Sequence, residues 1–293
     1  DGAHSGIDSA DTTEFNIDTE NRTATDHKVI AQSYQYRGQT HAVALGGNVY
    51  GGISRVANAT RENNITVSSG SYTNAYGGYT DSVPPLPGSA AKAHSAEKKN
   101  SHDNKITIAG ANVSGTVYGG YTTSTTGSAT KNKVEVTSGT VNNIVGGFSM
   151  AGAASNNEIT LKGGVTVGSV LGGQGATTEK NKVNLEGATV TGAVKGGSVG
   201  GAGHKLTVKG TNAAGSIVGF EKLRFNVGTA VGTNPMLTLT GGASTHVWNT
   251  LEAIGTTAGP VTLMENGAGI SFSNYDGAHS GIDSADTTEF NID

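Results

Sequence analysis

Apolar and polar residues alternate with a period of two through most of the chain, and this pattern predicts short β-strands. Segments such as KNKVEVTSGTVNNIVGG and KNKVNLEGATVTGAVKGG place Val, Ile and Leu at every second position of each strand. They contain no stripe with the i, i+3, i+4 spacing of a helix. Gly, Asn and Thr separate the strands and suit tight corners. We therefore expect an all-β protein.

One motif recurs along the chain and gives these strands a fixed period. The pattern Asn-x-(Ile/Val)-x-(Val/Ile/Leu) begins at five asparagines, with His204 in the Asn place of a weaker sixth copy. Each copy precedes an apolar run that ends in a Gly-Gly doublet, and successive doublets are 26, 42, 27, 26 and 24 residues apart. The asparagines are Asn63, Asn104, Asn132, Asn157 and Asn181. Fixed self-similarity of this kind is typical of stacked repeats.

The length of the repeat selects one architecture among the repeat proteins. A propeller blade needs about 40 residues in four antiparallel strands. A repeat of about 24–28 residues fits one rung of a parallel β-helix, where each strand pairs with its counterpart about 4.8 Å further along the axis. We predict such a β-solenoid, with the Gly-Gly doublets at corners where the backbone leaves no room for a Cβ atom.

Equivalent positions of a solenoid stack directly on one another, so repeated side chains form columns. The five asparagines should form a ladder of amides along the axis. Tyr79, Tyr121 and Phe148 each follow a doublet and should form an aromatic column. We interpret both columns as structural. The alternative for the aromatic column is an outer row of rings that binds a glycan.

The repeats divide the chain into four parts. We expect an acidic joint segment over residues 1–41, regular solenoid repeats over 42–220, an irregular solenoid or capping part over 221–275, and the start of a further unit over 276–293. Within the irregular part, residues 244–254 carry Val247, Trp248, Leu251 and Ile254 at helical spacing, and this spacing predicts a helix.

Residues 81–103 account for the one long interval between doublets and predict a loop. Pro lacks the N–H that a strand ladder needs, and the lysines of this segment favour water. The segment is either a contact loop on a rigid scaffold or a tolerated surface insertion. Its candidate contact residues are Pro84, Pro85, Pro87, Lys92, Lys98 and Lys99.

An 18-residue identity joins the two ends of the sequence. Residues 1–18, DGAHSGIDSADTTEFNID, recur unchanged as residues 276–293, so that Asp1 corresponds to Asp276. Either the natural polypeptide repeats a 275-residue unit in tandem, or a terminal segment was copied by design. A designed copy normally carries a flexible linker. Because Tyr275 runs directly into Asp276, we favour the tandem repeat.

Composition and charge narrow the classes of function. The 46 glycines, 34% hydrophobic residues and 14% charged residues favour a thin core of small side chains. A net charge of -4 gives no reason to expect a nucleic-acid partner, and no apolar stretch is long enough for membrane insertion.

Candidate catalytic and metal-binding motifs lack the context that their chemistry requires. Gly-Gly-Ser-Val-Gly at 196–200 matches a nucleophile elbow, but it is one of the repeat doublets and no helix is predicted after it. Five acidic residues gather between positions 8 and 20, with a spacing that matches no EF-hand loop. We expect no catalytic site, no cofactor and no metal.

The repeated N-x-V-x-V…G-x-V…V-Y-G-G-Y pattern from Asn104 to Tyr121, together with GSIVGFEKLRFNV and PMLTLTGG, resembles the Gly/Asn-rich passenger repeats of bacterial autotransporter-type surface adhesins. The resemblance covers about residues 42–275. It implies a β-helix displayed outside the cell, at the bacterial surface. The expected role is a non-catalytic structural or adhesive fibre, with self-stacking of identical units and contact with a host or neighbouring-cell surface or glycan. The alternatives are subunits that polymerise head to tail, and a β-helical protein that binds or cleaves polysaccharide.

Overall fold

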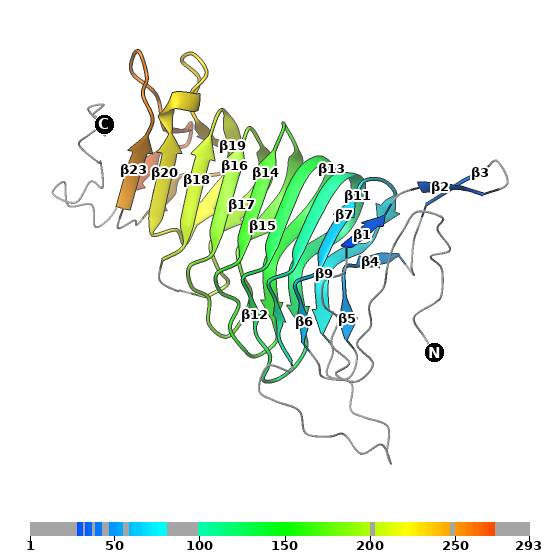
Figure 1. The fold of residues 1–293 in the computed structure, drawn as a ribbon. Helices are drawn as coiled ribbons and strands as arrows, with labels where there is room; N and C mark the ends of the chain where they lie inside the picture. The colour runs from blue at the N-terminus through cyan, green and yellow to red at the C-terminus, as the bar shows by residue number, and fades with distance from the viewer. Residues whose placement is uncertain are drawn as a thin grey trace.

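Parallel strands wound in successive turns make up most of the described part of the chain (Figure 1). The computed structural model describes residues 28–31, 33–36, 39–42, 47–54, 59–80, 99–199, 203–246 and 250–272. The structure is all-β with parallel stacked coils, so the predicted β-solenoid is confirmed. No α-helix occurs among the described residues.

A first column of nine parallel strands follows the repeated Asn motif in the described residues. In axial order it contains β1 (Lys28–Ala31), β7 (Asn64–Val67), the first part of β11 (Lys105–Thr122), the first part of β13 (Lys133–Ser149), β14 (Glu158–Lys162), β16 (Lys182–Glu186), β18 (Lys205–Lys209), β20 (Lys222–Asn226) and β23 (Thr250–Ile254).

A second column leads to the Gly-Gly doublets. It contains β4 (Asn48–Tyr50), β5 (Ile53–Ser54), β8 (Ser71–Tyr72), β9 (Asn74–Thr80), the second parts of β11 and β13, β15 (Thr166–Leu171), β17 (Thr189–Lys195), β19 (Asn212–Val218), β21 (Leu237–Leu239) and β24 (Met264–Asn266). A short third column returns the chain to the first one. Its strands are β6 (Thr60–Arg61), β10 (Ser101–His102) and β12 (Ala129–Thr130).

The remaining elements lie outside these columns. The strands β2 (Ser33–Tyr36) and β3 (Gln39–Ala42) form an antiparallel pair near the N-terminal end (Figure 1). Near the other end, β22 (Ser244–His246) pairs in parallel with β25 (Ile270–Phe272), and residues Val227–Thr229 form a single 3-10 turn.

The strand register gives the length of each rung. Lys105 is followed in the register by Lys133, Glu158, Lys182 and Lys205. The ladder residues that directly precede these positions are separated by 28, 25, 24 and 23 along the chain. These values are close to the repeat length expected from the sequence. The next rung, from Lys205 to Lys222, is shorter, because β19 leads almost directly into β20 without a third side.

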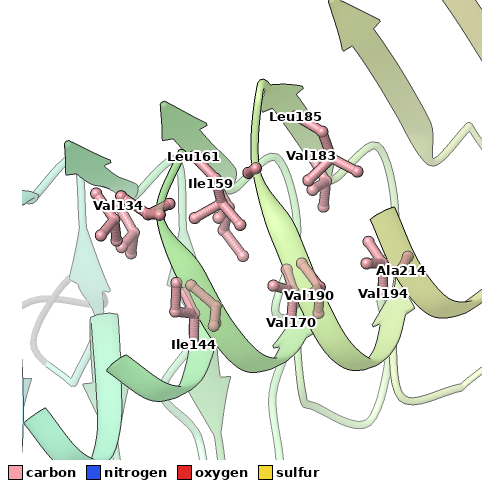
Figure 2. Close-up of a cluster of buried hydrophobic side chains, with 14 of the residues drawn as sticks. Val134, Ile144, Ile159, Leu161, Val170, Val183, Leu185, Val190, Val194 and Ala214 are labelled. Atoms are coloured by element: carbon pink, nitrogen blue, oxygen red, sulfur yellow. The ribbon is translucent and has the colours of Figure 1, made fainter. Parts of the chain in front are cut away.

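The core lies between the first and second columns. Each rung directs two apolar side chains inward from either column, for example Val134 and Val136 against Val141 and Ile144, all at most 2% exposed. Figure 2 shows the same arrangement repeated in the following rungs. Burying one such side chain contributes roughly 1.5–3 kcal/mol, so every rung adds a similar increment along the axis.

Two expectations about the edges of the repeat are wrong. The described residues of the predicted helix 244–254 are strands, β22 over 244–246 and β23 over 250–254. In β23 the buried Leu251 and Ala253 alternate with Glu252, and the strand pairs with the edge of β20. A helix would satisfy its own hydrogen bonds but would leave that edge unpaired. The predicted loop 81–103 also ends earlier, since Ser101 and His102 form β10 inside the solenoid.

Candidate functional site

The five repeated asparagines lie in one buried column at the corner that enters the first strand column, with exposed fractions of 0–1%. Asn63 Nδ2 donates to Asn104 Oδ1 at 2.7 Å, and Asn104 Nδ2 donates to Asn132 Oδ1 at 2.9 Å. The series continues at 3.1 Å to Asn157 and 3.3 Å to Asn181. From Asn63 to Asn157, each backbone N–H donates to the same oxygen as its own side chain. The amides of this asparagine ladder therefore all point the same way along the axis.

The second proton of the ladder amides after Asn63 is also satisfied. Nδ2 of Asn104, Asn132 and Asn157 donates to a third-column carbonyl, at 3.1, 2.9 and 3.0 Å. A buried amide that uses both protons and accepts two hydrogen bonds has no group left over. Asn is thus the side chain that fits these positions, because it has both a donor and an acceptor and no charge.

His204 ends the ladder. The backbone N–H of Asn181 donates to His204 Nδ1 at 3.2 Å, so this nitrogen is the acceptor and the proton of the neutral ring lies on Nε2. Nε2 faces Thr178 Oγ1 at 3.5 Å. Burial lowers the pKa of His204 below its ordinary value, against an opposing attraction from Glu221. The ladder therefore holds this imidazole in its neutral form.

The Gly-Gly doublets make room for the ladder and for one another. A Cβ atom on Gly78 would lie 2.5 Å from Asn104 Nδ2, and one on Gly147 would lie 2.6 Å from Asn157 Nδ2. A Cβ atom on the first glycine, such as Gly77, would collide with the carbonyl oxygen of its counterpart on the next rung. The expected lack of space is confirmed, and close approach rather than a left-handed φ is its cause.

A left-handed residue precedes every ladder position from Asn63 to His204. The φ values are 52–59° at five non-glycine residues and 80° at Gly203. The non-glycine residues are Glu62, Asp103, Lys131, Asn156 and Lys180. Because their side chains have nothing in common, no signal in the sequence marks this corner. L-residues rarely adopt this conformation, which costs roughly 1–2 kcal/mol each.

The predicted aromatic column is one half of a larger cluster. Tyr79, Tyr121 and Phe148 stack with centroid separations of 5.1 and 4.5 Å and interplanar angles of 5° and 11°. A second row lies beside it, with separations of 5.0 and 5.1 Å, and the two rows meet edge to face. The second row is formed by Tyr50, Tyr76 and Tyr118. The sequence signal for it was the tyrosine that directly precedes three of the doublets.

The stacking decides what this cluster can do. A sugar that packs on an aromatic ring needs a free ring face, but the inner rings are covered on both faces by rings of adjacent rungs. Burial, followed by repulsion from the neighbouring tyrosines, raises the pKa of Tyr76 above its ordinary value, so its hydroxyl stays neutral. Aromatic pairs of this kind contribute roughly 0.5–1.5 kcal/mol beyond area burial. This geometry favours a role in holding the rungs together.

A shallow groove of about 530 Å³ lies where the second column begins. Its lining includes the hydroxyl or amide groups of Ser71, Thr73, Asn112, Ser114 and Thr140, and no carboxylate. Glycoside hydrolysis by the common route needs a pair of carboxylates across the scissile bond. The groove can therefore offer hydrogen bonds to a ligand but not this acid–base chemistry.

Most of the predicted contact loop lies outside the described residues, including its three prolines, Lys92 and Lys98. Of the candidate contact residues only Lys99 is described, and its backbone carbonyl accepts a hydrogen bond from Thr122 Oγ1 at 2.7 Å. The acidic segment 8–20 and both copies of the repeated 18 residues also lie outside. Within the described ranges, no three His, Cys, Asp or Glu side chains come together as metal ligands, and no helix could cross a membrane.

No protein-family profile, curated protein or solved structure matches the chain.

Proposed function

We propose that the chain is a non-catalytic unit of an extracellular structural or adhesive fibre at a bacterial surface, in which 275-residue units follow one another along one solenoid axis. The observation that carries this proposal is the identity of residues 1–18 with residues 276–293. An unchanged 18-residue segment at a fixed offset is what a tandem array of units would contain.

The ends of the described solenoid support this proposal. At one end β1, β4 and β5 have an unpaired edge among the described residues, and at the other end β23, β24 and β25 do. Exposed strand edges are templates for further pairing. These strands all pair in parallel with the rung beside them, so a following unit would stack head to tail and would extend the array rather than close it.

The mass of the native polypeptide tests the proposal. We expect intact-mass measurement on the purified native material to give at least two 275-residue units in one chain. A chain of about the 29.4 kDa of this sequence that forms filaments would instead support subunits polymerising head to tail. A chain of that mass that stays monomeric at high concentration would contradict both assemblies.

The joint can be tested separately on the recombinant chain. We expect deletion of residues 276–293 to change the association of the isolated unit, because the segment is then missing from the end that the next unit would continue. The measurement is analytical ultracentrifugation of the full and truncated chains. Unchanged association and unchanged melting temperature would contradict a joint at this segment.

A further inference from the structure

The outward side chains of the first strand column, from Lys105 to Ile254, form a charged surface that we call the lysine face. Along the described strands it carries eight basic and four acidic side chains, whereas the whole chain has a net charge of -4. The lysine face is therefore a positive surface on a negative protein. It extends over successive rungs of one sheet (Figure 1).

Three lysines of this face are direct neighbours in the strand register. Lys182 pairs with Lys205, and Lys205 pairs with Lys222, on strands about 4.8 Å apart. Like charges at directly opposed positions of a sheet are destabilising. In the preceding rungs Lys105 also lies opposite Lys133, but Lys105 pairs with Glu135 at 3.2 Å and Lys133 lies 4.0 Å from Glu158. The row Lys182–Lys205–Lys222 differs because two of its three lysines have no such partner among the described residues.

Within the row Lys182–Lys205–Lys222, only Lys205 forms an ion pair with a described residue. Lys205 lies 3.8 Å from Glu252, which also pairs with Arg224. Lys182 and Lys222 are exposed and form no ion pair with any described residue. Burial, and then repulsion from Arg224, lowers the pKa of Lys205, with further repulsion from Lys182 and Lys222. An external anion would relieve this repulsion.

The residues beside the lysine row indicate what kind of anion fits. The next outward positions on the same three strands are Asn184, Thr207 and Arg224, preceded by Thr160 on the neighbouring rung. Thr160 and Thr207 offer hydroxyl groups to a ligand, and Asn184 offers its amide oxygen, because Asn184 Nδ2 already donates to Glu158 Oε1 and Thr160 Oγ1 at 3.0 Å. The outward positions of the described first-column strands contain no aromatic side chain, which binding of single-stranded nucleic acid normally uses for stacking.

We propose that the lysine face binds a linear acidic polysaccharide, whose carboxylate or sulfate groups lie along the row Lys182–Lys205–Lys222. Lysines meet such groups as separate point charges spaced along the row, whereas bidentate recognition of a single planar anion needs arginine, and the face has one arginine. A membrane surface is a poorer match, since the face has no row of apolar or aromatic side chains to enter the interface.

This inference rests on the proposed surface fibre for its biological setting, and it supplies a ligand for that fibre. Its experiment is separate, because binding is measured on the isolated chain and does not depend on how units are joined. Failure to bind would leave the mass and association tests untouched. Failure of those tests would leave the binding result untouched.

The experiment measures binding of the full chain to immobilised dextran sulfate and polygalacturonate by surface plasmon resonance, with neutral dextran as the blank. We expect binding that weakens with salt. The triple variant Lys182→Gln, Lys205→Gln, Lys222→Gln should lose at least about tenfold in affinity, since several exposed ion pairs are removed together. The matched control, Lys131→Gln, Lys180→Gln, Lys195→Gln, removes the same charge from exposed positions off the face and should change affinity less than about twofold.

A second variant separates binding from folding. Lys182→Gln with Lys222→Gln leaves the Lys205–Glu252 pair intact and should keep the melting temperature of the unaltered chain while still weakening binding. The proposal is overturned if the unaltered chain does not bind either polymer, or if the control triple weakens binding as much as the face triple. Equal or tighter binding to duplex DNA, or to phosphatidylserine vesicles, would overturn the polysaccharide assignment.

Discussion

The central rungs, 104–203, and the C-terminal rungs, 204–272, solve the same packing problem with different side chains. In the central rungs the large core residues are Val, Ile and Leu. A buried amide ladder fills the corner between the third column and the first column. In the C-terminal rungs the ladder is gone, and Phe220, Phe225 and Met236 are buried instead. The change occurs at His204, after which the chain reaches Lys222 in a shortened rung.

The difference follows from geometry. Adjacent rungs are about 4.8 Å apart, and each ladder amide must reach the amide of the next rung. The ladder therefore needs an equivalent corner on every rung. In the short rung the N–H groups of Glu221 and Lys222 both donate to the carbonyl of His204, so the chain enters the next strand without a third side. No corner remains for a following amide. Larger apolar side chains then fill the interior, which stays close-packed.

Breaking the ladder in the central rungs should have the largest effect. In Asn132→Asp a carboxylate oxygen replaces Nδ2 and faces two acceptors, Ser101 O at 2.9 Å and Asn157 Oδ1 at 3.1 Å. An uncompensated buried charge costs about 3–5 kcal/mol, so we expect that loss in urea unfolding at neutral pH. The control is Asn142→Asp on the exposed surface, which should change stability by less than about 0.5 kcal/mol. Equal midpoints for the two variants would contradict an internal ladder.

Filling the space beneath the ladder should have the next largest effect. A Cβ atom on Gly120 would lie 2.6 Å from Asn132 Cγ, so Gly120→Ala must displace the amide or the backbone. Overpacking of this kind costs roughly 1–3 kcal/mol. In the C-terminal rungs Gly242→Ala meets nothing within 4 Å and should be neutral in the same thermal melts. A silent Gly120→Ala would show that the doublet has no packing role.

The repeated features were readable from the sequence because each uses one residue type at one position. Asn at the ladder and Gly-Gly at the close approach recur with a common period, so the solenoid and its rung length could be predicted. The left-handed corner could not, since Glu, Asp, Lys and Asn all occupy it. The left-handed residue lies between the third column and the ladder residue. This position sets its conformation, and the propensity of the residue itself does not.

The wrong and missing predictions have physical reasons as well. Spacing alone assigned a helix to 244–254, but the open edge of β20 offers five paired positions that a strand can use. The lysine face was not predicted from the sequence. Lys does directly follow the ladder residue at four positions, after Asn104, Asn132, Asn181 and His204. Only the strand register shows which of these lysines meet a glutamate and which meet another lysine.

A smaller, pH-dependent effect should mark the boundary between the two regions. Burial lowers the pKa of His204 below its ordinary value of 6.5, so on acidification through 6.5 the unfolded chain takes up a proton before the folded chain does. Stability should therefore fall as the pH drops below 6.5, until the folded pKa is also passed. Protonation at Nδ1 would also remove the acceptor for the Asn181 N–H.

The control for this effect is His204→Asn, which supplies an amide oxygen at the same place and does not titrate. Melting temperatures of both chains between pH 7.5 and 5, a range chosen to span the ordinary pKa of 6.5, should show a larger acid loss for the unaltered chain. Identical pH profiles would mean that His204 is not held neutral by the ladder.

The smallest effect concerns the corner before the ladder, where the two regions again differ. At the boundary this position is Gly203, whereas Lys131 holds it in the central rungs with a φ of 57°. Releasing an L-residue from this conformation gains about 1–2 kcal/mol, and the added freedom of glycine in the unfolded chain offsets about 0.5–1 kcal/mol. Lys131→Gly should therefore stabilise the protein by about 0.5–1 kcal/mol in urea unfolding.

The matched comparison for this corner is Lys133→Gly, two positions further on within β13. It should destabilise the protein by about 0.5–1 kcal/mol, because glycine weakens a strand interior. The same substitution should thus have opposite signs at the corner and in the strand. A loss of stability at both positions would show that the left-handed corner stores no strain.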